Sequence, residues 1–244
     1  NEIIKELKKT TFNEKGNKIN FDSLRFEEIH VDNSNNEEKE KLIYKNSLDM
    51  LEKNEKVFFL GGDHALTYST GRAFLDYCKR AEKEPCLIVF DAHFDSATSE
   101  SAGKSRRWVR EIVEKGFPAR NILIVGARKF EIMEKEFILK GGIRQMMLNK
   151  IRENIGEMTD TIMEFAYNKE LYVSVDFDVI DPAFAPAVVC GEPGGLTSRD
   201  ILYMLGRISL MKNLKAMDIV EIDAEKDRTG MTIKLGAKVL AEVL

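Results

Sequence analysis

Three short acidic motifs stand out in the chain because each brings several potential metal ligands together within a few residues. They are Gly61-Gly62-Asp63-His64, Asp91-Ala92-His93-Phe94-Asp95 and Asp176-Phe177-Asp178-Val179-Ile180-Asp181-Pro182. In the second and third motifs the ligand-type side chains alternate with other residues, so an extended backbone would point them to one side. Several negative charges in one place are costly unless cations neutralise them. The motifs therefore predict a metal site that holds more than one ion.

The side chains best suited to this site are imidazoles and carboxylates. They are His64, Asp91, His93, Asp95, Asp176 and Asp178. Because one ion takes about four to six ligands, such a set with bridging carboxylates suits two ions. A set rich in carboxylates and without thiolates favours Mn²⁺ or a similar ion over structural Zn²⁺. Two ions that share a site can lower the pKa of a bridging water and so supply hydroxide at neutral pH.

Short apolar runs precede the second and third motifs, at residues 86–90 and 171–175. Such runs are typical of buried parallel strands, and open α/β sheets bind ligands at the carboxyl ends of their strands. A single Asp at such a position is more often a helix cap or a turn residue. The repetition of the pattern after two strands favours the metal interpretation.

Strand and helix patterns alternate along most of the chain. We expect further strands at 57–60, 121–125, 145–148 and 214–220, and a weaker one at 26–31. We expect helices at 37–53, 66–80, 106–115, 130–139, 150–168, 198–208 and 232–244. The alternation predicts an α/β fold with a mainly parallel sheet and right-handed crossovers. Because no composition break divides the chain, we expect a single domain over 1–244.

Composition narrows the classes of function. The net charge is −4 and the pI is about 5.6, so the chain has no basic footprint for nucleic acid. No apolar run approaches the ~20 residues that span a bilayer, so we expect no membrane segment. The first residues are too polar for a signal peptide, and 3 scattered cysteines are too few for a disulfide framework. These features favour a protein of a reducing compartment, the cytoplasm.

Several segments together resemble one known family. They are Gly-Gly-Asp-His at 61–64, Phe-Asp-Ala-His-Phe-Asp at 90–95, Val-Gly-Ala-Arg at 125–128, Ser174 through Leu196, and Asp218-Ile-Val-Glu-Ile-Asp223 followed by Asp227. This combination resembles the ureohydrolase family of arginases, agmatinases and formimidoylglutamases, over about residues 55 to 244. The resemblance is strongest to agmatinase-like members, from Val173 to the C-terminus especially.

The resemblance implies a three-layer α/β/α domain with a binuclear manganese centre, two Mn²⁺ per chain. It also implies a homo-oligomer, usually a trimer or hexamer. The ligands carried over by position for one ion are His64, Asp91, Asp95 and Asp176. Those for the other ion are Asp91, His93, Asp176 and Asp178, with Asp91 and Asp176 as bridges.

The resemblance also assigns two catalytic roles. Asp95 would orient the bridging hydroxide, and Glu221 would pair with the guanidinium of a small-molecule substrate. A carboxylate suits that place because a planar guanidinium presents a fork of donors. Hydroxide attack on the guanidinium carbon would give a tetrahedral intermediate that collapses to urea and an amine. The alternative for Glu221 is an ordinary surface carboxylate.

The departures from the family pattern concern substrate recognition and not metal binding. The loop at 96–108 has no histidine, whereas family members usually carry one there that helps in proton transfer to the leaving amine. The step Val189-Cys190-Gly191-Glu192 replaces the usual Gly-Thr-Pro, and the N-terminal part is short. Formimidoylglutamases also tend to carry Phe within Asp-Ala-His-Phe-Asp, and their loops often lack the histidine.

Arg106 and Arg107, at the end of this loop, are the expected contacts for a carboxylate at the far end of the substrate. The alternative is a basic helix N-terminus on the surface, although cations there oppose the helix dipole. The leading hypothesis is a hydrolase that cleaves a linear guanidino C–N bond and releases urea. The alternatives are a hydrolase of formimidoylglutamate or another guanidino acid, and a catalytically weakened family member without enzymatic function.

Overall fold

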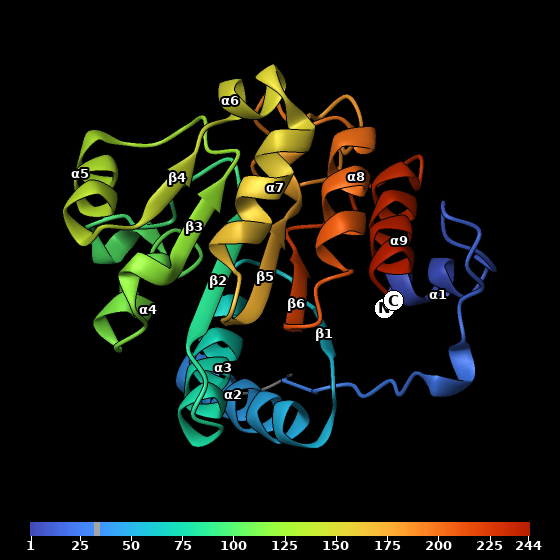
Figure 1. Ribbon diagram of the computed structural model, residues 1–244, viewed down its shortest axis with the longest axis horizontal. Coiled ribbons are helices and arrows are strands. Elements are labelled where there is room, and N and C mark those ends of the chain that lie inside the picture. Colours follow the sequence, from blue (N-terminus) through green and yellow to red (C-terminus); the bar gives the residue numbers. More distant parts are fainter. Residues whose placement is uncertain (32–34) are drawn as a thin grey trace.

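The computed structural model describes residues 1–31 and 35–244. Within these residues a 6-stranded sheet forms the centre, with strand order β1-β6-β5-β2-β3-β4 (Figure 1). The strands are β1 (Val57–Leu60), β2 (Pro85–Phe90), β3 (Ile122–Val125), β4 (Arg144–Met146), β5 (Glu170–Asp176) and β6 (Leu214–Val220). Every neighbouring pair is parallel, as the alternation of strands and helices predicts.

Helices connect the strands and cover both faces of the sheet. They are α1 (Glu2–Leu7), α2 (Asn36–Lys53), α3 (Leu66–Arg80), α4 (Trp108–Glu114), α5 (Ile132–Gly141), α6 (Leu148–Glu153), α7 (Ile155–Phe165), α8 (Ser198–Ile208) and α9 (Met231–Val243). Short 3₁₀ turns lie at Phe21–Ser23, Glu100–Ala102, Ala119–Asn121 and Phe177–Val179.

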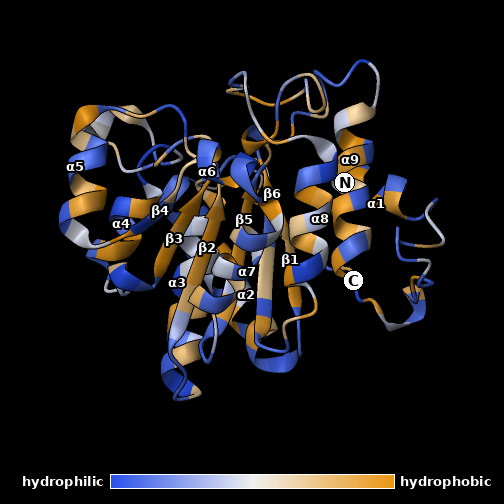
Figure 2. Cartoon of the chain, turned by 45° about the horizontal axis from the view of Figure 1, so that its top comes forward, coloured by the Kyte–Doolittle hydropathy of each residue, from blue (hydrophilic) through white to orange (hydrophobic). Residues whose placement is uncertain are grey.

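A separate hydrophobic core lies on each face of the sheet. Because side chains alternate along a strand, Val173 and Val175 of β5 face one core and Tyr172 faces the other. The first core contains residues of α1, α6, α7, α8 and α9, and the second contains residues of α2, α3, α4 and α5. Figure 2 shows the hydrophobic colouring concentrated along β2, β3 and β5, between these helices. The expected three-layer α/β/α fold with a mainly parallel sheet is therefore confirmed.

The observed elements differ from the expected ones in three places. The helix expected at 150–168 is two helices, because Asn154 is extended and its side chain accepts a hydrogen bond from Glu157 N, which starts α7. The strand expected at 26–31 is wrong, since these residues form no regular element and Phe26 stays 47% exposed, away from either core. Helix α1 was not expected, and it packs against α9 through the first core (Figure 1).

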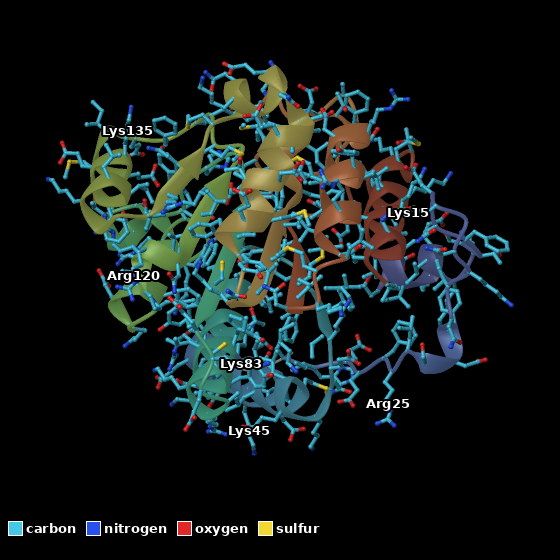
Figure 3. All side chains as sticks on the ribbon, viewed as in Figure 1. Lys15, Arg25, Lys45, Lys83, Arg120 and Lys135 are labelled. Atoms are coloured by element: carbon cyan, nitrogen blue, oxygen red, sulfur yellow. The ribbon has the colours of Figure 1, made fainter. Side chains whose placement is uncertain are left out.

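Charged side chains are spread over the surface, apart from a buried set that includes Asp91, Asp176 and Asp178. Of the side chains labelled in Figure 3, those of Arg25, Lys45, Arg120 and Lys135 stand at the outline of the molecule. Across the residues that the structure describes, no helix has both the length and the apolar character needed to cross a bilayer.

Candidate metal centre

The candidate ligands stand at the carboxyl ends of neighbouring strands. Asp91 directly follows β2, and Asp176 is the last residue of β5, which pairs with β2. Glu221 directly follows β6, and His64 lies just beyond the end of β1. Strands β1, β6, β5 and β2 are consecutive in the sheet, so residues far apart in sequence meet at one edge.

The first ligand group surrounds one nitrogen of a buried histidine. His64 Nδ1 lies 3.2 Å from Asp91 Oδ2, 3.0 Å from Asp95 Oδ2 and 3.1 Å from Asp176 Oδ2. An octahedral ion with ligands at about 2.1 Å holds neighbouring donor atoms about 3.0 Å apart. All four side chains are buried. The spacing of these donors therefore suits a small divalent cation.

The second ligand group shares one carboxylate with the first. It consists of Asp91, His93 and Asp178, and His93 Nδ1 lies 2.8 Å from Asp178 Oδ2 and 3.5 Å from Asp91 Oδ1. Asp91 thus turns Oδ2 to one group and Oδ1 to the other, which is the arrangement of a bridging ligand. Asp176 belongs to the first group alone, and its Oδ1 accepts a hydrogen bond of 2.8 Å from Asp178 N. Its bridging role stays a prediction.

Other aspartates of the three motifs have structural positions. Asp181 accepts hydrogen bonds from the backbone N–H groups of Ala183, Gly194 and Gly195, so it closes the turn after the third motif. These bonds hold the pKa of Asp181 below its ordinary value. Asp63 is exposed and lies outside both ligand groups.

Two of the crowded carboxylates, Asp91 and Asp176, have raised pKa values when no cation neutralises them. Burial, with the charges of Asp95 and Asp178, raises the pKa of Asp91 to about 7. Burial also raises the pKa of Asp176 well above its ordinary value. Burial would lower the pKa of His93, but hydrogen bonds with Asp178 and Asp91 outweigh it and raise that pKa to about 11. Protons and metal ions therefore compete for the same donors.

A buried network fixes which nitrogen of His64 faces the carboxylates. Ser174 Oγ donates to Asp218 Oδ1 over 2.7 Å, so it accepts from His64 Nε2, 2.9 Å away. In the neutral ring, the form that binds metal, the Nδ1 lone pair then points at the first group. Among the described residues, His64 Nδ1 and Asp91 Oδ2 are buried and have no hydrogen-bond partner. A cation would satisfy both atoms, so the residues fit a bound metal.

Asp218 anchors this network from the middle of β6. Its Oδ2 accepts from the hydroxyls of Thr67 at 2.8 Å and Tyr172 at 2.7 Å. Burial raises the pKa of Asp218, while these donors and Ser174 oppose the rise. Sequence reasoning assigned no role to Asp218 or Ser174. Their signal was present, because each is a polar side chain between apolar residues inside a buried strand.

Two site carboxylates stand on strained backbone. Asp95 has φ of 46° and Glu221 has φ of 66°, a region that favours glycine. Glu221 Oε1 accepts from His64 N at 2.7 Å, and Glu221 N donates to Gly62 O at 2.8 Å. Such strain persists only where surrounding contacts determine it, and it concentrates at functional sites. Glu221 is therefore a buried residue beside His64 and not a surface carboxylate.

The Val-Gly-Ala-Arg segment holds the third motif in place. Arg128 donates to the carbonyl oxygens of Asp178 at 2.7 Å and Val179 at 3.2 Å, and also to that of Glu192 at 2.6 Å. Gly126 has φ of 98°, and a Cβ there would lie 2.5 Å from Val179 Cγ2. A glycine is therefore required where this segment crosses the motif.

Arg106 and Arg107 are both engaged in ion pairs. Arg106 Nη2 lies 3.3 Å from Glu131 Oε1, and Arg107 Nε lies 3.5 Å from Glu111 Oε1. A substrate carboxylate would have to compete with these glutamates. The contact of either arginine with substrate stays a prediction.

Comparison with known proteins agrees with this geometry. A family model described as "Arginase family" matches residues 2–244. Proclavaminate amidinohydrolase from Streptomyces clavuligerus is 30% identical over 202 residues, which cover 80% of this chain and 63% of that protein. Mitochondrial arginase 1 from Oryza sativa subsp. indica is 32% identical over 188 residues, which cover 75% of this chain and 53% of that protein. The chain thus spans less than two thirds of the length of these relatives.

Solved structures show the same architecture. The crystal structure of formimidoylglutamase from Bacillus subtilis has a TM-score of 0.87 at 23% identity, covering 99% of this chain and 78% of that one. A hypothetical agmatinase from Burkholderia thailandensis has a TM-score of 0.72 at 25% identity, covering 84% of this chain and 63% of that one. The expected resemblance to ureohydrolases is confirmed, and the chain belongs to the arginase family.

Proposed function

We propose that residues 1–244 form a single metallohydrolase domain that uses two Mn²⁺ ions to hydrolyse a linear C–N bond. The substrate would be a small guanidino or formimino compound. The observation that carries this proposal is the sharing of Asp91 between two ligand groups, each with its own histidine. Membership of the arginase family supports it. The carboxylate-rich donor set, which lacks thiolates, favours Mn²⁺.

The proposed ligands divide between the two ions as the groups do. His64, Asp91, Asp95 and Asp176 would hold the first ion. Asp91, His93 and Asp178 would hold the second, and Asp176 would join them as a second bridge if its carboxylate turned slightly. When bound, two divalent cations lower the pKa of a water that lies between them.

The remaining steps belong to residues of the chain. Asp95 would accept a hydrogen bond from the attacking water and hold it in line with the amidino carbon. Glu221 Oε1 is occupied by His64 N, so Oε2 would accept from the substrate N–H groups. Addition of the water oxygen gives a tetrahedral carbon, and its C–N bond to the amine then breaks. The leaving amine takes up a proton, which Asp95 is placed to carry because the 96–108 loop has no histidine.

Two classes of substrate are compatible with this proposal. A guanidino substrate such as agmatine or arginine would release urea. A formimino substrate such as formimidoylglutamate is the second candidate. It is favoured by the Phe within Asp-Ala-His-Phe-Asp and by the absence of a loop histidine. An acidic substrate would place its distal carboxylate near Arg106 and Arg107.

A non-enzymatic role is the alternative from another class. The missing loop histidine favours it. The complete ligand set opposes it, because a chain without metal would be more stable without crowded carboxylates. We also propose a homo-oligomer, a trimer or hexamer, which light scattering on the purified chain would test.

A product screen tests the proposal directly. The Mn²⁺-loaded protein would be incubated with agmatine, arginine, guanidinobutyrate and formimidoylglutamate. Urea would identify guanidino cleavage, and formamide would identify formimino cleavage. Turnover that needs Mn²⁺ and is lost in Glu221→Gln would support the enzyme. A metal-loaded protein that is silent on all four compounds would favour the non-enzymatic alternative.

A further inference from the structure

Trp108, the first residue of α4, touches two members of the first ligand group. It is the single tryptophan of the chain, and its side chain is fully buried. Its Nε1 donates a hydrogen bond of 2.9 Å to Asp95 Oδ2, the same oxygen that lies 3.0 Å from His64 Nδ1. Its ring packs on the His64 ring, with centroids 4.7 Å apart and an angle of 47° between the planes.

The backbone around Trp108 holds this contact in register. Val109 N donates to Asp95 O at 3.1 Å, and Ala97 N donates to Arg106 O at 3.0 Å. The start of α4 is thus joined to the strained Asp95 itself and to Ala97, two residues further on. These backbone bonds tie the segment that carries the indole to the segment that carries Asp95.

We propose that Trp108 is a positioning residue for the metal centre, because its N–H fixes the Asp95 carboxylate and its ring fixes the His64 imidazole. A carboxylate that accepts a fixed N–H keeps one rotamer, so less freedom is lost when it binds a cation. The contact between the two rings limits rotation of the His64 imidazole. This inference rests on the metal centre of the proposed function and goes beyond its ligands and catalytic groups.

Removal of the N–H alone is the sharpest test. Because the chain has 1 Trp, growth of a tryptophan auxotroph on 3-benzothienylalanine replaces the indole N–H with sulfur at this position only. Trp108→Phe is the second variant, which keeps an aromatic ring but loses the donor. We expect each to lower Mn²⁺ affinity about 10–100-fold, as loss of a ligand's hydrogen-bond partner usually does. Competition with a chelating dye at 25 °C measures this affinity in the folded protein.

A matched control separates positioning from packing. Phe117 is buried in the same hydrophobic core and belongs to neither ligand group. Phe117→Leu should lower the melting temperature of the metal-free protein and leave Mn²⁺ affinity unchanged. In wild type, Mn²⁺ should also quench the fluorescence of Trp108 with the same midpoint as the dye competition, because a paramagnetic ion would lie beside the indole.

The outcomes distinguish this inference from the proposed function. Weaker Mn²⁺ binding in the benzothienyl protein, with Phe117→Leu unchanged, would support it. Wild-type affinity in the benzothienyl protein would overturn it and leave the proposed metal centre standing. No Mn²⁺ binding by wild type would overturn both.

Discussion

Ser174 Oγ lies 2.9 Å from His64 Nε2, and this one hydroxyl decides which nitrogen of His64 faces the carboxylates. The hydroxyl proton goes to the fully buried Asp218, so the imidazole must donate at Nε2. The orientation of a candidate metal ligand thus depends on a neutral side chain that binds no metal.

We expect Ser174→Ala to lower Mn²⁺ affinity about 10–100-fold, because His64 loses the partner that sets its tautomer. The free energy of unfolding should fall by about 1–3 kcal/mol, since Asp218 also loses a buried donor. Dye competition and urea denaturation measure the two effects. Ser69→Ala is the control, because Ser69 is buried and its Oγ has no hydrogen-bond partner within the described ranges. Equal Mn²⁺ affinity in the two variants would contradict the tautomer argument.

Metal analysis of the Mn²⁺-loaded protein should give about two ions per chain, because Asp91 serves two ligand groups. Asp178→Asn should lose mainly one ion, since Asp178 belongs to the second group only. Asp91→Asn should weaken the binding of both ions. Asp63→Asn, an exposed neighbour of His64 outside either group, should bind as wild type does. Stoichiometry near zero for wild type at saturating Mn²⁺ would refute the two-ion centre.

The melting temperature of the metal-free protein should fall as pH rises from about 5 to 8. The pKa of Asp91 is about 7 in the folded chain against an ordinary 3.8, so its proton stabilises the fold at low pH and is lost through pH 7. His93, with a pKa of about 11 against 6.5, acts in the same direction above neutral pH. Asp178 has a lowered pKa and acts oppositely, but only in more acidic solution.

Bound Mn²⁺ should reverse this trend, because cations need deprotonated ligands. The gap in melting temperature between loaded and metal-free protein should widen with pH, and scanning calorimetry would show it. Asp176→Asn should raise the melting temperature of metal-free protein at pH 8, because a neutral amide replaces a carboxyl group that burial and its neighbours make costly to ionise. A metal-free protein whose stability does not change with pH would argue against crowding in the centre.

Glycine should be better tolerated than alanine at position 221. Either substitution removes the carboxylate that accepts from His64 N. Only alanine must adopt φ of 66° with a Cβ, which costs about 1–2 kcal/mol. We therefore expect the free energy of unfolding of Glu221→Gly to be about 1 kcal/mol higher than that of Glu221→Ala. Both variants should be inactive. The reverse order would mean that the backbone at this position relaxes once the carboxylate is gone.

If Arg106 or Arg107 binds the far end of an acidic substrate, replacement by alanine should raise KM about tenfold and leave kcat nearly unchanged. Agmatine, with a distal amine, should not show this loss. Arg120→Ala is the control, because Arg120 is exposed in the 3₁₀ turn that precedes β3 (Figure 3). This turn lies at the amino ends of the strands, whereas the candidate metal centre lies at their carboxyl ends. If agmatine proves the best substrate in wild type, these arginines serve only their ion pairs with Glu131 and Glu111.

The strands and the clustering of the candidate metal ligands could be predicted because their signals are local. The strand expected at 57–60 and the helix expected at 66–80 coincide with β1 and α3. The side chains predicted as ligands lie together in two candidate groups, and their binding of metal stays a prediction. They are His64, Asp91, His93, Asp95, Asp176 and Asp178. An apolar run that ends in carboxylates gives both the strand and the edge where its ligands lie.

The supporting residues could not be predicted because their partners are distant in sequence. Thr67 and Asp218 are hydrogen-bonded although they lie 151 positions apart in the chain. The sequence around one of them does not indicate that the other is its partner. Trp108 lies 13 positions after Asp95, and its contact depends on how the intervening loop folds. Asn154 splits a helix through its own capping bond, which an amphipathic pattern does not reveal.

The hydrogen bond from His64 N to Glu221 Oε1 joins residues 157 positions apart in the chain. Contacts of such long range form late in folding, because the entropy cost of closing a long loop must be met before the contact contributes any stabilising energy. A cation that needs β1, β2 and β5 already in register cannot guide their pairing. A bound metal should therefore slow unfolding and so prolong the lifetime of the folded chain. It should leave the rate of folding almost unchanged.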